Sequence, residues 1–271
     1  MQEFMDRLDR ALSFSPLNSY ILFLLADAQK TIGNDEVAAR YYRKAIRLNP
    51  AQATYLQSYG FFLSKHGERI MADSLLQAGV RHDRSNPDRK RKYAKFLIDG
   101  NENEKGLQVI ASVFAQDPNG AENDMAFIVE AGISDNDIRR NLPTRVVPHL
   151  AFAAHLEQKG DQEQAAALYR QSLTYIDNEK NVRPYYFYWV SRFFSKQKRY
   201  EEGLDVIMQG IKLFPADAGM RIRAGNLYRN MGLAHRAVEQ YQQALSIDQT
   251  NPQASKHLEK FQKEMDKKIK L

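Results

Sequence analysis

Two consecutive stretches of equal length decide the fold: SYILFLLADAQKTIGNDEVAARYYRKAIRLNPAQ (residues 19–52) and ATYLQSYGFFLSKHGERIMADSLLQAGVRHDRSN (residues 53–86). Both are 34 residues long, and residues of similar size fall in the same columns when one is written above the other. The columns run large, small, turn, small, large and small, in the pairs Leu25 and Tyr59, Ala26 and Gly60, Gly33 and Gly67, Ala38 and Ala72, Tyr42 and Leu76, and Ala45 and Gly79. This period and size order are typical of helical hairpins that stack on one another.

The same period runs through most of the chain. Pro16, Pro50 and Pro118 are separated by one and then two lengths of 34 residues. The size order recurs in four further repeats, which are residues 87–120, 146–179, 184–217 and 218–251. Small residues let the two antiparallel helices of a hairpin approach closely, and large residues fill the space between successive hairpins. The sequence therefore predicts six stacked hairpins.

At these columns the chain resembles the tetratricopeptide repeat (TPR) family, whose repeat has this length and this order of residue sizes. The resemblance implies an all-α, right-handed superhelical solenoid of TPR-type hairpins that acts as a non-catalytic scaffold for protein–protein interaction. Lys90, His149 and Arg221 depart from the pattern because each replaces a large apolar residue, and Gln249 replaces the closing proline of the last repeat. We expect these departures to loosen single contacts and to leave the fold intact.

Five segments describe the predicted organisation. They are residues 1–18 (the second helix of a truncated repeat), 19–120 (three repeats), 121–145 (an irregular, degenerate repeat), 146–251 (three repeats) and 252–271 (a capping helix). The capping helix is expected from apolar residues at helical spacing, namely Leu258, Phe261, Met265 and Ile269. Because the chain opens in the second half of a repeat, we expect the natural protein to continue upstream.

Composition excludes several classes of protein. Of the 271 residues 43% are hydrophobic and 27% are charged, as in a soluble folded protein. No apolar run approaches the ~20 residues needed to span a bilayer, and residues 1–10 lack the apolar core of a signal peptide. The absence of cysteine excludes disulfides and thiolate chemistry, and leaves a cytoplasmic or a periplasmic location open.

The residue types that carry catalysis are scattered. The six histidines are scattered over several repeats, and His149 and His155 are six residues apart, which places them on different faces of a helix. Neither a metal-ligand pair nor a nucleophile–base pair can be assembled from this spacing. Glycines fall at turns and close-packing columns without a phosphate-binding spacing. We therefore predict a protein that is not an enzyme and has no catalytic, cofactor or metal site.

One stretch is strongly basic. Residues 81–95 hold seven basic and two acidic residues, a net charge of +5 in a chain whose total is +6. Arg91 and Lys95 share a helix face at i and i+4, and the TPR resemblance places that face in the concave groove. One interpretation is binding of an anionic partner, which could be an acidic peptide, a lipid headgroup or an anionic glycan; the other is a solvated helix start that aids solubility. Nucleic acid is disfavoured because Tyr93 alone supplies an aromatic ring here.

A second stretch, YYFYWVSRFF (residues 185–194), is aromatic. The repeat register assigns Phe187, Val190 and Phe194 to the core. The TPR resemblance places Tyr185, Tyr188 and Arg192 in the groove, with Trp189 beside them and with Arg223 and Asn226 of the last repeat as an extension. Ring faces with hydroxyls and a guanidinium suit a peptide backbone or a sugar ring. The alternative is that these aromatic residues fill an irregular contact beside the degenerate repeat.

A more distant resemblance concerns the biological setting. Residues 137–156 and 200–215 look like the soluble repeat tails of bacterial O-antigen ligase or polymerase-type membrane proteins. It implies a scaffold in cell-envelope polysaccharide assembly, tethered to a membrane by segments upstream. The rival hypothesis is direct binding of an anionic glycan, lipid headgroup or acidic peptide in the groove.

Salt dependence distinguishes these two hypotheses. Binding of an anion through Arg91 and Lys95 should weaken sharply as ionic strength rises, because exposed charges are screened within about 10 Å at 0.1 M salt. A titration of the partner at increasing NaCl measures this, and an affinity that does not change with salt contradicts the anionic interpretation.

Overall fold

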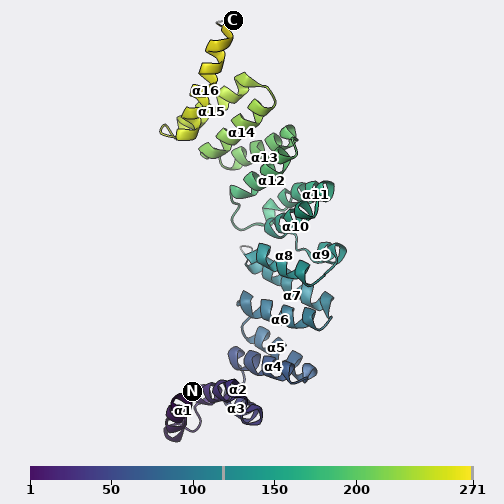
Figure 1. The fold of residues 1–271 in the computed structure, drawn as a ribbon, viewed down its shortest axis with the longest axis vertical. Helices are drawn as coiled ribbons and strands as arrows, with labels where there is room; N and C mark the ends of the chain where they lie inside the picture. Colours follow the sequence, from purple (N-terminus) through teal and green to yellow (C-terminus); the bar gives the residue numbers. More distant parts are fainter. Residues whose placement is uncertain (118–119, 270–271) are drawn as a thin grey trace. The chain divides into compact units, whose positions relative to one another are not determined.

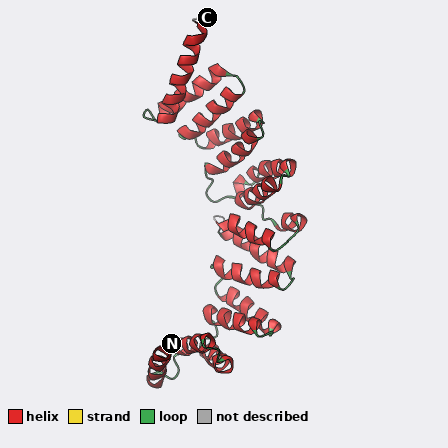
Figure 2. Cartoon of the chain, in the orientation of Figure 1, coloured by secondary structure: helices red, strands yellow, loops and turns green. Residues whose placement is uncertain are grey.

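The computed structural model describes residues 1–117 and 120–269, apart from the side chains of Ala115 and of residues 262–269. Within these ranges every regular element is a helix (Figures 1 and 2). Pro118 lies outside the described residues, as do the side chains of Met265 and Ile269. None of the described helices is both long enough and apolar enough to cross a membrane.

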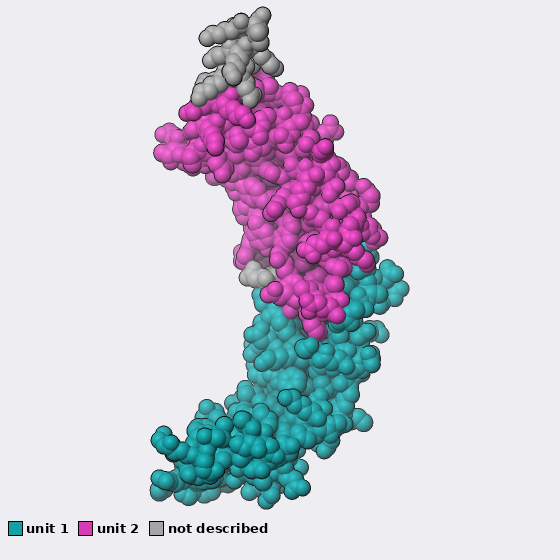
Figure 3. All heavy atoms as spheres, in the orientation of Figure 1, with its two compact units in different colours: residues 1–117, 131–141 teal, residues 118–130, 142–271 magenta. Residues whose placement is uncertain are grey.

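The chain forms two compact units (Figure 3). Unit 1 comprises Met1–Asp117 and Ala131–Asn141, and unit 2 comprises Pro118–Glu130 and Leu142–Leu271. The helices of unit 1 are α1 (Gln2–Phe14), α2 (Ser19–Thr31), α3 (Asp35–Leu48), α4 (Ala53–Lys65), α5 (Arg69–His82), α6 (Pro87–Asp99), α7 (Asn103–Gln116) and α9 (Asp135–Asn141). Those of unit 2 are α8 (Ala121–Glu130), α10 (Val146–Lys159), α11 (Gln162–Leu173), the 3-10 helix Ile176–Asn178, α12 (Tyr185–Lys196), α13 (Tyr200–Leu213), α14 (Ala218–Asn230), α15 (Ala234–Ile247) and α16 (Pro252–Ile269).

Helices pair in the order in which they follow one another. In unit 1, α2 packs on α3, α4 on α5 and α6 on α7; in unit 2, α10 packs on α11, α12 on α13 and α14 on α15. Each pair coincides with one of the six predicted repeats, and α1 and α16 pack on α2 and α15. The predicted fold class, an all-α solenoid of TPR-type hairpins, is confirmed. The predicted irregular segment, residues 121–145, holds the two short helices α8 and α9, of which α8 packs on α10 and α9 on α7.

Close approach of the two helices in a hairpin explains the column of small residues. A Cβ atom added to Gly225 would lie 2.5 Å from the ring of Tyr241, and one added to Gly60 would lie 2.8 Å from Leu76 Cγ. Neither distance is compatible with an added side chain unless the facing side chain or its helix shifts. The predicted alternation of small and large residues is therefore a steric requirement of the pairing.

Large residues of the second helices add a polar contact to this packing. Tyr169 and Tyr241 are fully buried, and their hydroxyls donate hydrogen bonds of 2.9 Å to Glu157 and Asn226 on the first helices. The ring fills the space between helices while the hydroxyl keeps a partner, as burial of a tyrosine requires.

The residues that depart from the apolar pattern are held by polar contacts. The buried His149 bonds through Nδ1 to the Arg145 carbonyl oxygen at 3.0 Å, and Arg221 donates to Gln243 at 2.7 Å. These positions lose an apolar contact and gain a hydrogen bond, so the stack continues through them.

A buried ion pair fixes the connection between α11 and α12. The Glu179 carboxylate, whose side chain is only 3% exposed, accepts hydrogen bonds from Arg145 Nε (2.9 Å), Arg145 Nη2 (2.7 Å) and the Val146 amide (2.9 Å). Burial alone raises the pKa of the Glu179 carboxyl, but the Arg145 and Val146 hydrogen bonds outweigh it and hold the pKa below its usual value. The contact ties the loop before α12 to the start of α10.

Replacing Glu179 tests this contact. We expect Glu179→Gln to lower the free energy of unfolding at pH 7 by about 2 kcal/mol, because it leaves Arg145 partly buried without its counter-charge. Since the folded-state pKa is depressed, the stabilisation is complete above the unfolded pKa of about 4.3 and is lost as pH falls through the folded value. Urea denaturation of both proteins between pH 7 and pH 3 measures it. Glu163→Gln is the control, because the Glu163 side chain is 85% exposed; equal effects of the two substitutions would contradict the assignment.

Candidate functional site

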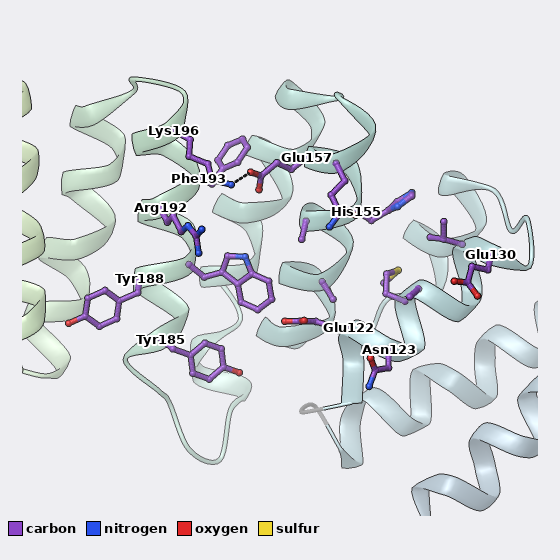
Figure 4. A pocket seen from close by; sticks show the side chains of 17 residues that line it. Glu122, Asn123, Glu130, His155, Glu157, Tyr185, Tyr188, Arg192, Phe193 and Lys196 are labelled. Atoms are coloured by element: carbon purple, nitrogen blue, oxygen red, sulfur yellow. Dashed lines mark hydrogen bonds and ion pairs between the residues drawn. The ribbon is translucent and has the colours of Figure 1, made fainter.

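Three helices of unit 2 enclose a groove of about 930 Å³ (Figure 4). One wall is α8, which contributes Glu122, Asn123 and Glu130; α10 forms the floor, and α12 forms the other wall. The helices are neighbours because α10 packs against both α8 and α12. We call this hollow the α8–α12 groove.

Small side chains on α10 make the groove hollow. Ala151 and Ala154 line its floor, and Ala126 of α8 lines it from the facing wall. At the columns of Ala151 and Ala154 the next repeat has Trp189 and Arg192, 38 residues later. The space that a larger residue would fill on α10 is therefore open, and α12 borders it with large side chains.

Aromatic side chains cover the α12 wall. Tyr185, Tyr188, Trp189 and Arg192 recur at the spacing of one helix face, and all four line the groove. The ring centroids of Tyr185 and Trp189 are 6.5 Å apart. The opposite face of α12 is fixed in the core, where the side chains of Phe187, Val190 and Phe194 are completely buried. Burial of that face is what presents the other to the groove.

Tyr188 is held in place by a contact with the next repeat. Its hydroxyl donates a 2.7 Å hydrogen bond to Asp217 Oδ1, and the same oxygen caps α14 by accepting from the Met220 amide at 3.0 Å. Burial, together with the bond to Asp217, raises the pKa of the Tyr188 hydroxyl above its ordinary value. The ring is therefore a fixed, neutral part of the wall.

Charges in the groove are only partly paired. Glu157 accepts from Lys196 at 2.8 Å and from Tyr169 at 2.9 Å, so it is satisfied within the chain. Glu122 and Glu130 on α8 and Arg192 on α12 are exposed, and in the described part of the chain none of the three forms a hydrogen bond or an ion pair. These three charges are available to a ligand.

The structure separates the predicted groove residues into two groups. Tyr185, Tyr188 and Arg192 line the α8–α12 groove, while Arg223 and Asn226 do not. Arg223 donates to Ser191 Oγ (3.3 Å) and to its carbonyl oxygen (3.0 Å). Asn226 accepts the hydroxyl of Tyr241. Arg223 is nonetheless anchored one residue from Arg192, whereas Asn226 serves the packing of its own hairpin.

Arg91 and Lys95 belong to unit 1 and have partners within the chain. Arg91 forms ion pairs with Asp88 (3.0 Å) and Asp117 (2.8 Å), and its side chain is 22% exposed. Lys95 approaches Asp99 at 3.5 Å. An external anion would have to displace the carboxylates on Arg91, so its binding at these two residues stays a prediction.

The remainder of the basic cluster includes buried residues. Arg89 is 9% exposed and pairs with Asp83 at 3.1 Å. Lys90 is similarly buried and donates to Gln116 Oε1 at 2.8 Å, and its burial lowers the pKa of the ammonium group. Part of the charge that marks residues 81–95 in the sequence therefore serves packing: Arg89 joins two neighbouring repeats, and Lys90 joins the two helices of its own hairpin.

Sequence reasoning missed the α8 wall and the α10 floor. Ala151 and Ala154 occupy the columns of Trp189 and Arg192 in the next repeat, 38 residues later, so the repeat register could have found them. Glu122 and Glu130 lie in the irregular segment, where the 34-residue repeat is interrupted, so no repeat position could predict them. In residues 1–117 and 120–269 the structure shows no group of three or more His, Asp or Glu side chains placed to hold a metal ion.

Comparison with known proteins supports the repeat assignment. The tetratricopeptide repeat family model matches residues 19–52 and residues 218–251, the first and the last predicted repeats. The resemblance to the tetratricopeptide repeat family is confirmed, and repeats of this kind serve as scaffolds for protein–protein interaction. No curated protein sequence matches the chain.

Solved structures of similar fold are distant in sequence. Yeast Tom70 is 11% identical, with a TM-score of 0.45 over 98% of this chain and 59% of that one. The C-terminal part of a TPR repeat-containing protein from Cytophaga hutchinsonii is 14% identical, with a TM-score of 0.42 over 94% of this chain and 93% of that one. A chain of the APC/C hetero-tetramer Cut9-Hcn1 is 13% identical, with a TM-score of 0.40 over 94% of this chain and 44% of that one. The chain thus spans less than two thirds of two of these three proteins.

The Tyr188–Asp217 contact gives a prediction for the groove wall. Tyr188→Phe should lower the free energy of unfolding by about 1–2 kcal/mol at pH 7, because a hydrogen bond to a charged group is lost. Thermal and urea denaturation measure the change. Tyr20→Phe is the control, since Tyr20 is 59% exposed. Indistinguishable stabilities of the two variants would show that the Asp217 contact does not hold the wall.

Proposed function

We propose that the α8–α12 groove binds a segment of another protein and that the chain is a non-catalytic interaction scaffold. The observation that carries the proposal is the groove of about 930 Å³, bordered by partly exposed aromatic side chains and unpaired charges. Tyrosine, tryptophan and arginine are the residues enriched where protein interfaces gain most of their binding free energy. All three occur on one face of α12.

The shape of the site favours a peptide over a small molecule. Small-molecule sites enclose most of the ligand and are lined largely by apolar groups, whereas this groove runs open across three helices and carries charges on both walls. A bound peptide can place side chains between the α12 rings and the alanines of α10, and the Tyr185 hydroxyl can bond to its backbone.

The narrower hypotheses drawn from the sequence stay predictions. A role in envelope-polysaccharide assembly, attachment to a membrane upstream, and binding of a glycan or lipid headgroup rest on sequence resemblance and residue type. The aromatic rings of Tyr185 and Trp189 would also suit a sugar, so glycans belong among the ligands to be tested.

A selection with a blocked groove tests the proposal. Peptides from a random phage-displayed library are selected on the wild-type protein, and their affinities are compared with Ala154→Arg, which places a long side chain on the groove floor. We expect at least a tenfold loss of affinity, because the blocked site excludes peptide side chains. The same proteins are applied to a glycan array.

The matched control is Ala167→Arg. Ala167 is exposed on α11, the second helix of the same hairpin, and does not line the groove. Peptides that bind the Ala154→Arg variant as tightly as the wild-type protein would contradict the proposal. Glycan binding that is lost in Ala154→Arg, without any selected peptide, would favour the rival ligand.

A further inference from the structure

Arg192, on the α12 wall of the α8–α12 groove, has a second arginine near it, Arg223 of the next repeat. Arg192 projects from α12 into the groove. Arg223 lies on α14, 34 residues after Trp189 and therefore in the same column of the next repeat. Its guanidinium is anchored on Ser191 through both Nε and Nη2. A second cation is thus held at the turn of α12 from which Arg192 projects.

No carboxylate neutralises this pair within the described residues. Ser191 supplies the hydrogen-bond partners of the half-buried Arg223, and Arg192 forms neither a hydrogen bond nor an ion pair there. Burial and then the charge of Arg192 lower the pKa of the Arg223 guanidinium. Like charges held together at a partly buried site cost free energy, and an anion placed between them removes that cost.

The facing wall of the groove, α8, has the opposite charge. Glu122 and Glu130 on α8 are exposed, and among the described residues neither forms a hydrogen bond or an ion pair. Glu157 on α10 and Lys196 on α12 neutralise each other at 2.8 Å. The charges that have no ion-pair partner among the described residues are therefore separated across the groove: they are negative on α8 and positive on α12 and α14.

We infer that the ligand of the groove is a protein segment of mixed charge, with an acidic side chain bound by Arg192 and Arg223 and a basic side chain bound by Glu122 or by Glu130, which are about 12 Å apart along α8. An apolar side chain between them lies over the alanines of α10 and against Trp189. This inference rests on the proposed function and specifies the partner that the groove selects.

Helix spacing sets the distance between the two charges on the ligand. Neighbouring packed helices are about 10 Å apart, so α8 and α12, on either side of α10, are about 20 Å apart. An extended chain covers this distance in about six residues. A guanidinium binds a carboxylate through two parallel hydrogen bonds, and the separated charges fix the direction in which the segment lies.

Trp189 supplies the measurement, because it is the single tryptophan of the chain and lines the groove. The probe is a synthetic peptide of about nine residues with lysines at one end, a central leucine and glutamates at the other end. The comparison peptide has glutamine in place of each glutamate. Titration of each peptide is followed by Trp189 emission and by calorimetry.

We expect the bipolar peptide to bind about fivefold or more tightly than the glutamine peptide, in the range of a partly exposed charge pair. Arg192→Gln should remove most of this difference, since it deletes the partner of the peptide carboxylate. Arg223→Gln should act in the same direction, with its folding checked by thermal denaturation. Because Arg192 is exposed, its variant carries the test even if Arg223→Gln is destabilised. Lys212→Gln, an exposed cation on α13, is the matched control and should preserve the difference.

The outcomes separate this inference from the proposed function. If titration of Trp189 emission gives the same affinity for both peptides, the groove binds peptides without discriminating between them by charge. In that case the inference alone fails. It also fails if Arg192→Gln and Lys212→Gln behave alike. A bipolar peptide that produces neither an emission change nor heat overturns the inference, and the library selection with Ala154→Arg then decides independently whether the groove binds peptides.

Discussion

Close contact between the two helices of each hairpin is the constraint on which the rest of the structure depends. Gly60 and Gly225 occupy positions where even one added carbon would meet a neighbouring side chain at less than 3 Å. The large residue on the facing helix, Leu76 or Tyr241, fills the space that the glycine leaves. In these two hairpins the helices therefore have a fixed relative orientation, and the outward faces of the first helices are fixed with them.

The α8–α12 groove also depends on residue size, which differs between α10 and α12. In α12 one face is buried through Phe187, Val190 and Phe194, which leaves the tyrosines, the tryptophan and the arginine on the other. In α10 the corresponding outer face has alanines, so no side chain fills the space between α8 and α12. A regular scaffold thus gains an individual site by changing residue size at positions that do not hold the hairpin together.

The fold and the site could be predicted from the sequence only where residues follow the 34-residue repeat. The repeat register located the six hairpins and the exposed face of α12, because both depend on spacing along one chain. It could not show that Arg91 is paired with Asp117, or that Asn226 accepts the hydroxyl of Tyr241, because these contacts join separate helices. The α8 wall was missed for a different reason: Glu122 and Glu130 lie in the segment where the period is interrupted.

The two short helices of that segment belong to different compact units, α9 to unit 1 and α8 to unit 2. The units are therefore interleaved along the chain, and no single peptide bond separates one from the other. Cleavage after Asp117 would remove α9 from unit 1, and cleavage after Asn141 would remove α8, with a wall of the groove, from unit 2. Gene fusion or recombination at a single breakpoint can therefore keep one unit intact but never both.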